Sequence, residues 1–329
     1  MTVIPDPFVK RPTPRVRVSA IIPTFNRPAA LRRTLETVFA LNPAPDELFV
    51  VDQSDDPDPE LASFLRRAPT GMSVQYVRQR PADAQAARNR AAIASTGDIL
   101  LFLDDDILLE RDLLAAHLKN YEDPKVGAVG GFFLEPGEQP TERLPPHYFR
   151  RHTGWIYFPH GHVARMETGL FPSCNGSIRR EILFRAGGFD ENYIRTQLDD
   201  TDLSCRLREM HVRIVHDPDA RAYHLKEPAG GRRPSGVNEF VIADSATWQI
   251  WWYFFWTNFG VRGWRDIAVR FRGCVMRRVN VLRPWHLVLA VYHFVRGAMR
   301  ARAAVRSGRI LPLRLVSADV NADRTACAS

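Results

Sequence analysis

Three short segments in the first third of the chain are almost continuously apolar, namely residues 16–25, 47–54 and 98–105. Each is rich in Val, Ile, Leu or Phe and ends at polar or acidic residues, which is typical of strands in a parallel sheet covered on both faces. Between them, residues 27–41 space leucines helically and residues 83–95 are rich in alanine, so both predict helices. The alternation of strand and helix predicts the start of a doubly wound α/β domain.

The pattern continues beyond these segments. Residues 110–121 predict a helix, and the apolar residues 126–134 predict a strand. Two polar stretches rich in Pro or Gly, residues 136–147 and 226–236, predict surface loops. Gly97 is expected to end the alanine-rich helix in the left-handed conformation that glycine adopts readily.

The last third of the chain has a different character. Residues 247–260 are aromatic, and residues 262–306 combine helical periodicity with many arginines. Of the net charge of +8, residues 262–314 contribute +12, from thirteen arginines and the single acid Asp266, and the remainder contributes −4. We therefore expect three parts: a loose N-terminal leader over 1–15, a catalytic domain over 16–245, and a basic, aromatic, amphipathic helical extension over 246–329.

Length and composition narrow the class of protein. A chain of 329 residues with 45% hydrophobic and 25% charged residues is ordinary for a globular protein. The four cysteines show no CxxC spacing, so a zinc or dithiol site is not expected and a reducing compartment is the simpler assumption. The longest apolar stretches, such as residues 285–295, are about 11 residues long, short of the roughly 20 that a membrane-spanning helix needs.

The basic C-terminal stretch favours an anionic partner. Its arginines and aromatic residues suit the surface of an anionic membrane. Nucleic acid would use the same arginines, but no zinc, helix-turn-helix or aromatic RNA-binding signature accompanies them. The other reading is that these helices pack on the catalytic domain with their arginines in water.

Three acids lie at the end of the third apolar run, LLFLDDDIL, residues 100–108. If the strand continues through them, Asp104 and Asp106 point to one face and Asp105 to the other. Two like charges on one face repel each other unless a cation or protons neutralise them. Mg²⁺ or Mn²⁺ would suit this place, because both accept oxygen ligands. The alternative is that the acids only end a strand and begin the next helix.

The acids do not stand alone, because each of the three predicted strands ends in polar residues. These are residues 24–27, 52–55 and 104–106. In doubly wound sheets ligands bind beyond the carboxyl ends of the strands, so the three polar groups should meet at one edge.

Five motifs occur in order along the chain: IIPTFNRPAALRRTL, FVVDQSDD, AARNRAAIASTGDILLFLDDD, CNGSIRREILFRAGGFDE and LDDTDLSCRLRE. In this order, over about residues 16–224, the chain resembles the family 2 inverting glycosyltransferases of the GT-A fold. The resemblance implies a Rossmann-like, mostly parallel sheet flanked by helices. It also implies transfer of a sugar from a nucleoside-diphosphate donor to a saccharide or lipid-linked saccharide acceptor, as in surface polysaccharide synthesis. A polyprenyl-phosphate glycosyltransferase is the alternative within this class.

The resemblance assigns the donor-binding residues by position. Asp52 would read the nucleotide base, and since a carboxylate can accept the imide N–H of uracil or thymine, a UDP or dTDP donor is favoured. The other residues implied to contact the nucleotide are Thr24, Asn26, Arg27, Arg88 and Asp105. Those implied to hold Mn²⁺ or Mg²⁺ against the diphosphate are Asp104, Asp106 and His224.

The same likeness assigns the chemistry. Inversion by a single displacement needs a base that takes the proton of the acceptor hydroxyl. Asp200 is the candidate base and Asp199 the candidate acceptor-binding residue, although the family usually has Glu at the position of Asp199. The residues implied to lie near the donor sugar or the acceptor are Asn175, Gly176 and Asp190. His160 and His162 have no family match and remain surface or acceptor-site residues.

Two rival functions belong to other classes. A strand followed by DxD also resembles the nucleophile motif of haloacid-dehalogenase-like phosphatases, but those usually have Thr or Val where this chain has Leu108. A non-enzymatic binding module would have little reason to place five acids at strand and helix ends. We expect a cytoplasmic enzyme that can attach peripherally to the inner face of the membrane.

Overall fold

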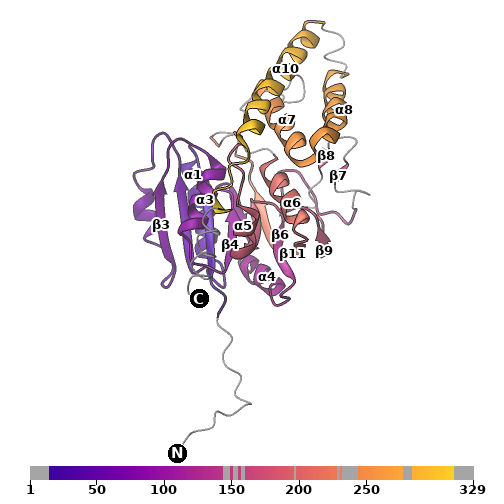
Figure 1. Cartoon of the computed structure of the whole chain (residues 1–329). Coiled ribbons are helices and arrows are strands. Elements are labelled where there is room, and N and C mark those ends of the chain that lie inside the picture. Colours follow the sequence, from indigo (N-terminus) through magenta and orange to yellow (C-terminus); the bar gives the residue numbers. More distant parts are fainter. Residues whose placement is uncertain are drawn as a thin grey trace, which may run out of the picture.

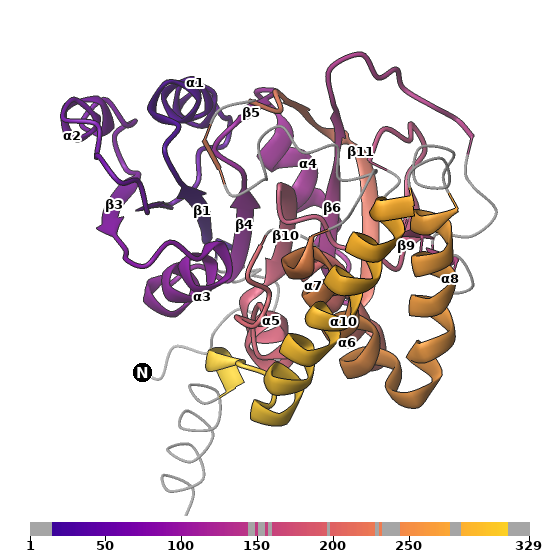
Figure 2. The same ribbon diagram turned by 90° about the horizontal axis from the view of Figure 1, so that it is seen from above.

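The computed structural model describes residues 15–143, 149–150, 155–156, 160–195, 198–227, 230–231, 244–276 and 284–314. In this part of the chain a nine-stranded sheet carries helices on both faces, and a group of helices projects from one end of it (Figures 1 and 2). The predicted α/β fold with a C-terminal helical region is therefore confirmed. The expected leader falls outside the described residues except for Arg15.

The main sheet has the strand order β3-β2-β1-β4-β10-β6-β11-β5, with β9 paired to β11. Its strands are β1 Val18–Thr24, β2 Glu47–Asp52, β3 Ser73–Arg78, β4 Ile99–Leu103, β5 Ile107–Leu109, β6 Val126–Leu134, β9 Met166–Thr168, β10 Asn175–Arg179 and β11 Arg213–His224. A separate hairpin consists of β7 Phe149–Arg150 and β8 Trp155–Ile156. The helices are α1 Pro28–Phe39, α2 Leu61–Leu65, α3 Ala84–Ala94, α4 Leu113–Asn120, α5 Arg180–Ala186, α6 Asp199–Glu209, α7 Ser245–Phe259, the 3₁₀ turn η1 Gly260–Arg262, α8 Gly263–Val275 and α10 Pro284–Ser307.

The sheet is parallel in its first half and mixed in its second. Strands β3, β2, β1 and β4 run parallel to one another, as the alternating strands and helices predict. Strand β10 is antiparallel to both β4 and β6, and it joins the N-terminal half to the parallel pair β6 and β11. The polar carboxyl ends of β1, β2 and β4 therefore lie at the same edge of the sheet.

Most of the elements predicted from hydrophobicity are present. Strands β1, β2 and β4 lie within the three apolar runs, and α1, α3, α4 and β6 lie within the segments predicted for them. Within the parallel half, α2 and β3 have no sequence prediction. Strand β3 is the edge strand, and its residues are partly or fully exposed, so it lacks the continuous apolar run that marks its neighbours.

The prediction for Gly97 is wrong. Helix α3 ends at Ala94, and Ser95 leaves it in an extended conformation, with φ −74° and ψ 158°. Gly97 is not among the residues with positive φ. A Cβ atom at this position would lie 2.5 Å from the Oγ atom of Ser19, so glycine is needed for close approach of two backbone segments.

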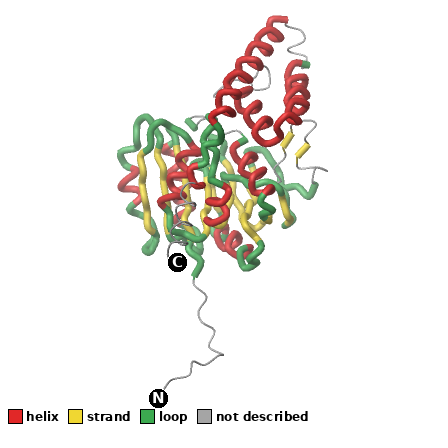
Figure 3. The backbone as a smooth tube through the Cα atoms, in the orientation of Figure 1, coloured by secondary structure: helices red, strands yellow, loops and turns green. Residues whose placement is uncertain are grey.

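Apolar side chains pack on each face of the sheet and in the helical region. On one face Leu31 and Leu35 of α1 are buried with residues of α2 and α4, and on the other Ala87 of α3 packs with residues of α5 and α6. Figure 3 shows α7, α8 and α10 as a separate group of helices beside the sheet. They share a third core around Trp248 and Phe254. None of the described helices has both the length and the apolar character needed to cross a membrane.

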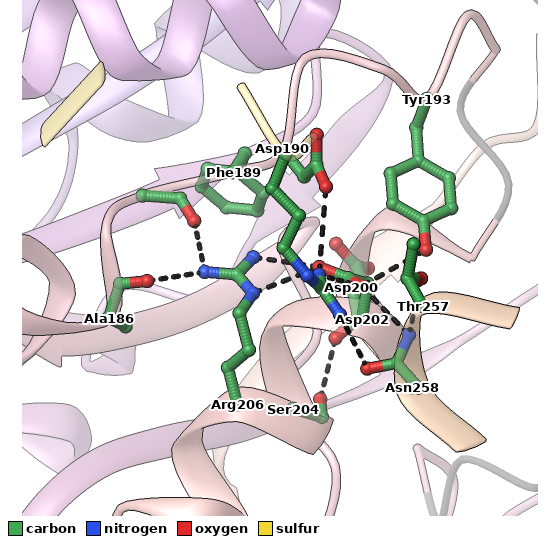
Figure 4. Close-up of polar contacts among 12 residues, drawn as sticks. Ala186, Phe189, Asp190, Tyr193, Asp200, Asp202, Ser204, Arg206, Thr257 and Asn258 are labelled. Carbon is green, nitrogen blue, oxygen red and sulfur yellow. Dashed lines mark hydrogen bonds and ion pairs between the residues drawn. The ribbon is translucent and has the colours of Figure 1, made fainter. Parts of the chain in front are cut away.

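A buried polar network joins the helical region to the sheet domain (Figure 4). Its centre is Asp202 of α6, which has no exposed surface. Asp202 pairs with Arg206 and accepts hydrogen bonds from the Oη atom of Tyr193, at 3.0 Å, and the Nδ2 atom of Asn258 in α7, at 2.9 Å. Arg309, which follows α10, also pairs with Asp202. Helix α6 is therefore bonded both to α7 and to the segment that follows α10.

The chain returns to the sheet domain after α10. Leu313 is fully buried in the core beneath α3 and α5, and it lies against Gly188. Helix α7 begins at Ser245, and a domain boundary near residue 245 stays a prediction. The residues that follow α10 nevertheless pack on the domain that precedes the boundary.

Replacing Arg309 with Ala should lower the free energy of unfolding by roughly 1.5–3 kcal/mol, the usual worth of hydrogen bonds to a charged group. Burial alone would raise the pKa of Asp202, but Arg206 and Arg309 hold it below its ordinary value. The loss should therefore be full at neutral pH and should shrink as the pH falls below about 4, where the unfolded carboxyl takes up a proton. Urea denaturation followed by tryptophan fluorescence at several pH values measures it.

Arg306→Ala is the matched control, because Arg306 is an exposed arginine on the last turn of α10. It should change the free energy of unfolding by less than about 0.5 kcal/mol. Equal effects of the two substitutions would contradict the role given to Arg309.

Candidate active site

A cleft of about 460 Å³ lies at the carboxyl ends of β1 and β4. Polar residues from distant parts of the chain line it, in agreement with the expectation that the polar strand ends meet at one edge. Those relevant to its chemistry are Thr24, Arg27, Gln53, Arg88, Asp104, Asp105, Glu135, His160, Ser173, Asp199, Asp200 and His224.

Two carboxylates and a histidine come together on one side of the cleft. Ligand atoms of Asp104, Asp106 and His224 lie within 4.8 Å of one another. The Nε2 atom of His224 is 3.1 Å from the Oδ1 atom of Asp106 and 3.6 Å from the Oδ2 atom of Asp104. Two carboxylate oxygens and one imidazole nitrogen are a donor set that suits Mn²⁺ and also Mg²⁺. The residues present therefore fit the metal that the sequence predicts.

The sheet explains how the histidine reaches the acids. Strand β4 ends at Leu103, and Asp104 to Asp106 form the turn before β5. Strand β5 pairs with the end of β11, so that Ile107 lies opposite His224. Burial would lower the pKa of His224, but Asp106 and Glu135 raise it to about 9. In turn His224 and Lys226 lower the pKa of Glu135 to about 2.

Asp105 is not part of this cluster. Because Asp104 to Asp106 lie in a turn and not in a strand, the alternation expected from the sequence does not apply to them. Asp105 accepts a hydrogen bond from the Oγ1 atom of Thr24, at 2.7 Å, and pairs with Arg27, at 3.2 Å. Burial raises the pKa of Asp105 to about 6. Arg27 also pairs with Asp106, at 2.9 Å, and donates to the carbonyl of Glu227. Arg27 thus pairs with two of the three acids and also bonds to the segment that follows β11.

A second pair of carboxylates lies in the first turn of α6. Asp199 pairs with the Nη1 atom of Arg88, at 3.2 Å, and the Nη2 atom of Arg88 pairs with Asp104, at 3.3 Å. Arg88 is buried and therefore links the two acidic groups. This arrangement brings together residues from α3, the end of β4 and α6, all of which the sequence singles out.

Asp200 is the carboxyl group with unused hydrogen-bonding capacity. Its Oδ2 atom accepts from the backbone N–H of Ser173, at 3.0 Å, whereas its Oδ1 atom is buried and has no hydrogen-bond partner among the described residues. Burial, and then the charge of Asp199, raise the pKa of Asp200 to about 7. A carboxyl group of this kind can exchange a proton near neutral pH.

Two of the residues predicted to bind the nucleotide bond to neighbouring side chains outside the cleft lining. Asp52 is only 2% exposed and accepts hydrogen bonds from the Oη atom of Tyr76, at 2.7 Å, and from Arg78, at 2.8 Å. Asn26 forms two hydrogen bonds with Asp55, each 2.8 Å long. Neither lines the cleft in this conformation, and contact with a base through these side chains stays a prediction.

The residues predicted to lie near the sugars are not on the cleft wall either. The side-chain amide of Asn175 donates to the carbonyls of Phe132 and Ala220, at 3.0 and 2.9 Å, and so bridges strands of the sheet. Gly176 pairs with β4 and β6 within β10. Asp190 is fully buried beside the polar network around Asp202, and it accepts a hydrogen bond from the Oη atom of Tyr253, at 2.8 Å.

Glu135 and His160 also line the cleft. The sequence predicts no role for Glu135 and leaves His160 as a surface or acceptor-site residue. Glu135 directly follows β6, so the rule that drew attention to the acids after β4 applies equally to it. His160 stacks on Phe133, with ring centroids 4.7 Å apart and an interplanar angle of 16°. No sequence signal distinguishes the half-buried His160 from His162, which is buried and bonds to backbone carbonyls.

Comparison with known proteins adds a family to this geometry. Residues 19–186 match the sequence model of the family described as glycosyl transferase family 2. The chain is 27% identical to the O-antigen biosynthesis protein RfbC of Myxococcus xanthus over 247 residues, which cover 70% of this chain and 18% of the relative. It is 29% identical to a pre-mycofactocin glycosyltransferase of Mycobacterium tuberculosis over 212 residues, 63% and 42% of the two chains. The chain thus spans less than half the length of these two relatives.

Solved structures share the fold at low sequence identity. GalNAc-T7 with UDP, GalNAc and Mn²⁺ has a TM-score of 0.58 and 13% identity, with 90% of this chain and 58% of that chain covered. Residues 1–349 of S. aureus TarS give a TM-score of 0.53 and 13% identity, with coverage of 86% and 81%. These likenesses support the GT-A type of fold and nothing finer.

Asp200→Asn should make the protein more stable at pH 8 while changing little at pH 4. The pKa of Asp200 is raised to about 7, so between about pH 4 and 7 the folded state holds a proton that the unfolded state has lost. The stability of the native protein must therefore fall as the pH rises through this window, and the amide removes that fall. Thermal unfolding measured at intervals from pH 4 to 8.5 gives the comparison.

The exposed Asp56→Asn is the control and should leave the pH dependence unchanged. If the native protein and Asp200→Asn showed the same pH dependence, the raised pKa of Asp200 would be refuted.

Proposed function

The chain belongs to glycosyl transferase family 2, and we propose that it transfers a sugar, with inversion, from a nucleoside-diphosphate donor to a saccharide or lipid-linked saccharide acceptor. One observation carries the proposal: a potential metal site and a carboxyl pair with a raised pKa share one cleft and are linked by Arg88. The family match includes the three acids after β4, which argues against the phosphatase alternative.

Asp104, Asp106 and His224 would hold Mn²⁺ or Mg²⁺ against the donor diphosphate. The metal would supply positive charge that offsets the charge developing on the leaving nucleoside diphosphate. Arg88, which is buried and already faces both acidic groups, would orient the phosphates. The structure of GalNAc-T7 contains UDP and Mn²⁺ in a related fold, which supports this assignment.

Asp200 would act as the base. The acceptor hydroxyl gives its proton to the Oδ1 atom of Asp200, its oxygen forms a bond to the anomeric carbon, and the bond from that carbon to the diphosphate oxygen breaks. Two features support this role, which are the free Oδ1 atom and the pKa of about 7. Asp199 would bind the acceptor while Arg88 holds its carboxylate in place.

The donor would carry uracil or thymine. Asp52 ends β2, beside Thr24 at the end of β1, and its Oδ1 atom accepts from the backbone N–H of Ser54. Each carboxylate oxygen has two lone pairs, so this atom can also accept the imide N–H of a base. Asn26 and Arg27 would flank the nucleotide from the loop after β1, and Asp105 would face the ribose.

The acceptor would be part of a surface polysaccharide, in line with the description of the Myxococcus xanthus relative as an O-antigen biosynthesis protein. A lipid-linked acceptor would lie at the inner face of the membrane. The basic C-terminal region supports peripheral attachment there, and the catalytic part would work in the cytoplasm.

Asp200→Asn should lower kcat by about 10²- to 10⁴-fold, the usual contribution of a general base. For the native enzyme kcat/KM should rise with pH and level off above an apparent pKa near 7, because only the ionised carboxyl accepts a proton. Initial rates of sugar transfer across pH 5.5–9 measure both effects. Binding of the donor to the variant, followed by thermal shift, shows that the site is intact. Full transfer by the variant would overturn the assignment.

A panel of nucleotide sugars tested with Mn²⁺ should single out UDP or dTDP donors. A ligand that binds only the folded state raises the melting temperature, by an amount that grows with its concentration over Kd. We expect stabilisation that EDTA and Asp106→Ala both remove. Stronger stabilisation by GDP-sugars would contradict the role of Asp52, and stabilisation that survives EDTA would contradict the metal site.

A further inference from the structure

Helix α10 has two opposite faces of different kinds. On the inner face Ala290 and Ala301 are buried, and Gly297 lies against Trp248 of α7. The outer face carries a row of large apolar residues that are 48–69% exposed. This row, the outer stripe, consists of Trp285, Val288, Tyr292, Val295 and Met299. The spacing of three and four residues keeps these side chains in one row along the helix.

The outer stripe is unusual for a face in contact with water. Exposed apolar residues are normally scattered singly over a protein surface, whereas a contiguous exposed row marks an interaction site. Figure 1 shows that α10 projects beyond the sheet domain. The packing that holds α10 in place comes from the opposite face and does not use the stripe.

The charges beside the outer stripe specify the partner. Helix α10 contains no acidic residue. Its exposed basic residues begin within the stripe and continue to the end of the helix; they are Arg296, Arg300, Arg302 and Arg306. Apolar and basic residues along one exposed helix are the combination that binds the headgroup region of an anionic membrane. Trp285 and Tyr292 are amphipathic side chains suited to that depth.

A second copy of the chain would be a poorer occupant. If two stripes faced each other, four arginines of each α10 would enter or border the interface, and the partner helix could offer no carboxylate. Like charges brought together at an interface disfavour association. An anionic lipid surface removes this conflict, because it supplies the opposite charge along the whole helix.

We propose that the outer stripe of α10 is a membrane-docking surface that lies flat in the headgroup region of an anionic bilayer. The apolar side chains enter the boundary of the acyl chains, and the arginines contact lipid phosphates. This inference deepens the proposed function, on which it rests for the lipid-linked acceptor. Docking through α10 does not involve the cleft, which lies on the sheet domain. It would keep the enzyme at the membrane surface where such an acceptor is found.

Flotation of the full-length protein with vesicles tests the docking surface. The protein should float with vesicles of phosphatidylcholine containing 30% phosphatidylglycerol and stay behind with pure phosphatidylcholine. Val288→Glu and Val295→Glu should each abolish flotation, because a carboxylate would be placed in the apolar row. Replacing Arg296, Arg300 and Arg302 with Gln should weaken binding by about fivefold for each arginine removed. High salt should weaken it too.

Ile93→Glu is the matched control, because Ile93 is an apolar residue 41% exposed on α3, away from the helical region. It should bind like the native protein. Thermal unfolding of every variant shows that the fold is retained. Flotation of Val288→Glu at the native level, or equal binding to both kinds of vesicle, would overturn the proposal.

Sedimentation velocity without vesicles addresses the other occupant. The native protein should sediment as a monomer. Val288→Glu should therefore leave the sedimentation coefficient unchanged. A dimer that Val288→Glu dissociates would assign the stripe to a second copy and refute membrane docking. The assays contain no donor or acceptor, so failure of docking and failure of the proposed transfer reaction can be told apart.

Discussion

Repulsion among carboxylates in one cleft is the constraint on which the site depends. Six acids converge there from three distant segments: Asp104, Asp105, Asp106, Glu135, Asp199 and Asp200. In a partly buried cleft such charges are costly unless cations or protons offset them. Arg27 and Arg88 provide fixed positive charge between the acids, and His224 provides a further partner. At Asp200 these cations do not fully offset burial and the charge of Asp199, and its pKa is therefore raised.

The topology of the sheet is what makes the compensation possible. Arg27 and Arg88 begin or lie within the helical connections of the parallel half, while His224 comes from the far half through the pairing of β11 with β5. Asp199 and Asp200 lie in the first turn of α6, where the helix dipole favours negative charge. Charges from four segments can therefore meet without any of them leaving its regular element or the adjoining turn.

The sequence predicts the segments of the site better than the direction of individual side chains. The end of an apolar run is enough to bring Asp104, Asp105 and Asp106 to the cleft, but they lie in a turn, where the alternation of a strand does not set their directions. A motif, however, identifies a stretch of chain and not the neighbours of each residue. Asn175 and Asp190 belong to matching motifs, yet their polar atoms bond to Phe132, Ala220 and Tyr253, which no motif connects to them. His160 reaches the cleft only through tertiary packing on Phe133.

The junction at Asp202 has a consequence for how such a protein can change during evolution. Asp202 and Arg309 are more than a hundred positions apart, yet each compensates the other inside the same buried network. Exchange of the helical region between relatives would separate them and leave the buried Asp202 with Arg206 as its remaining cationic partner among the described residues. The two parts should therefore be inherited together, and substitutions at one of these positions should be accompanied by substitutions at the other.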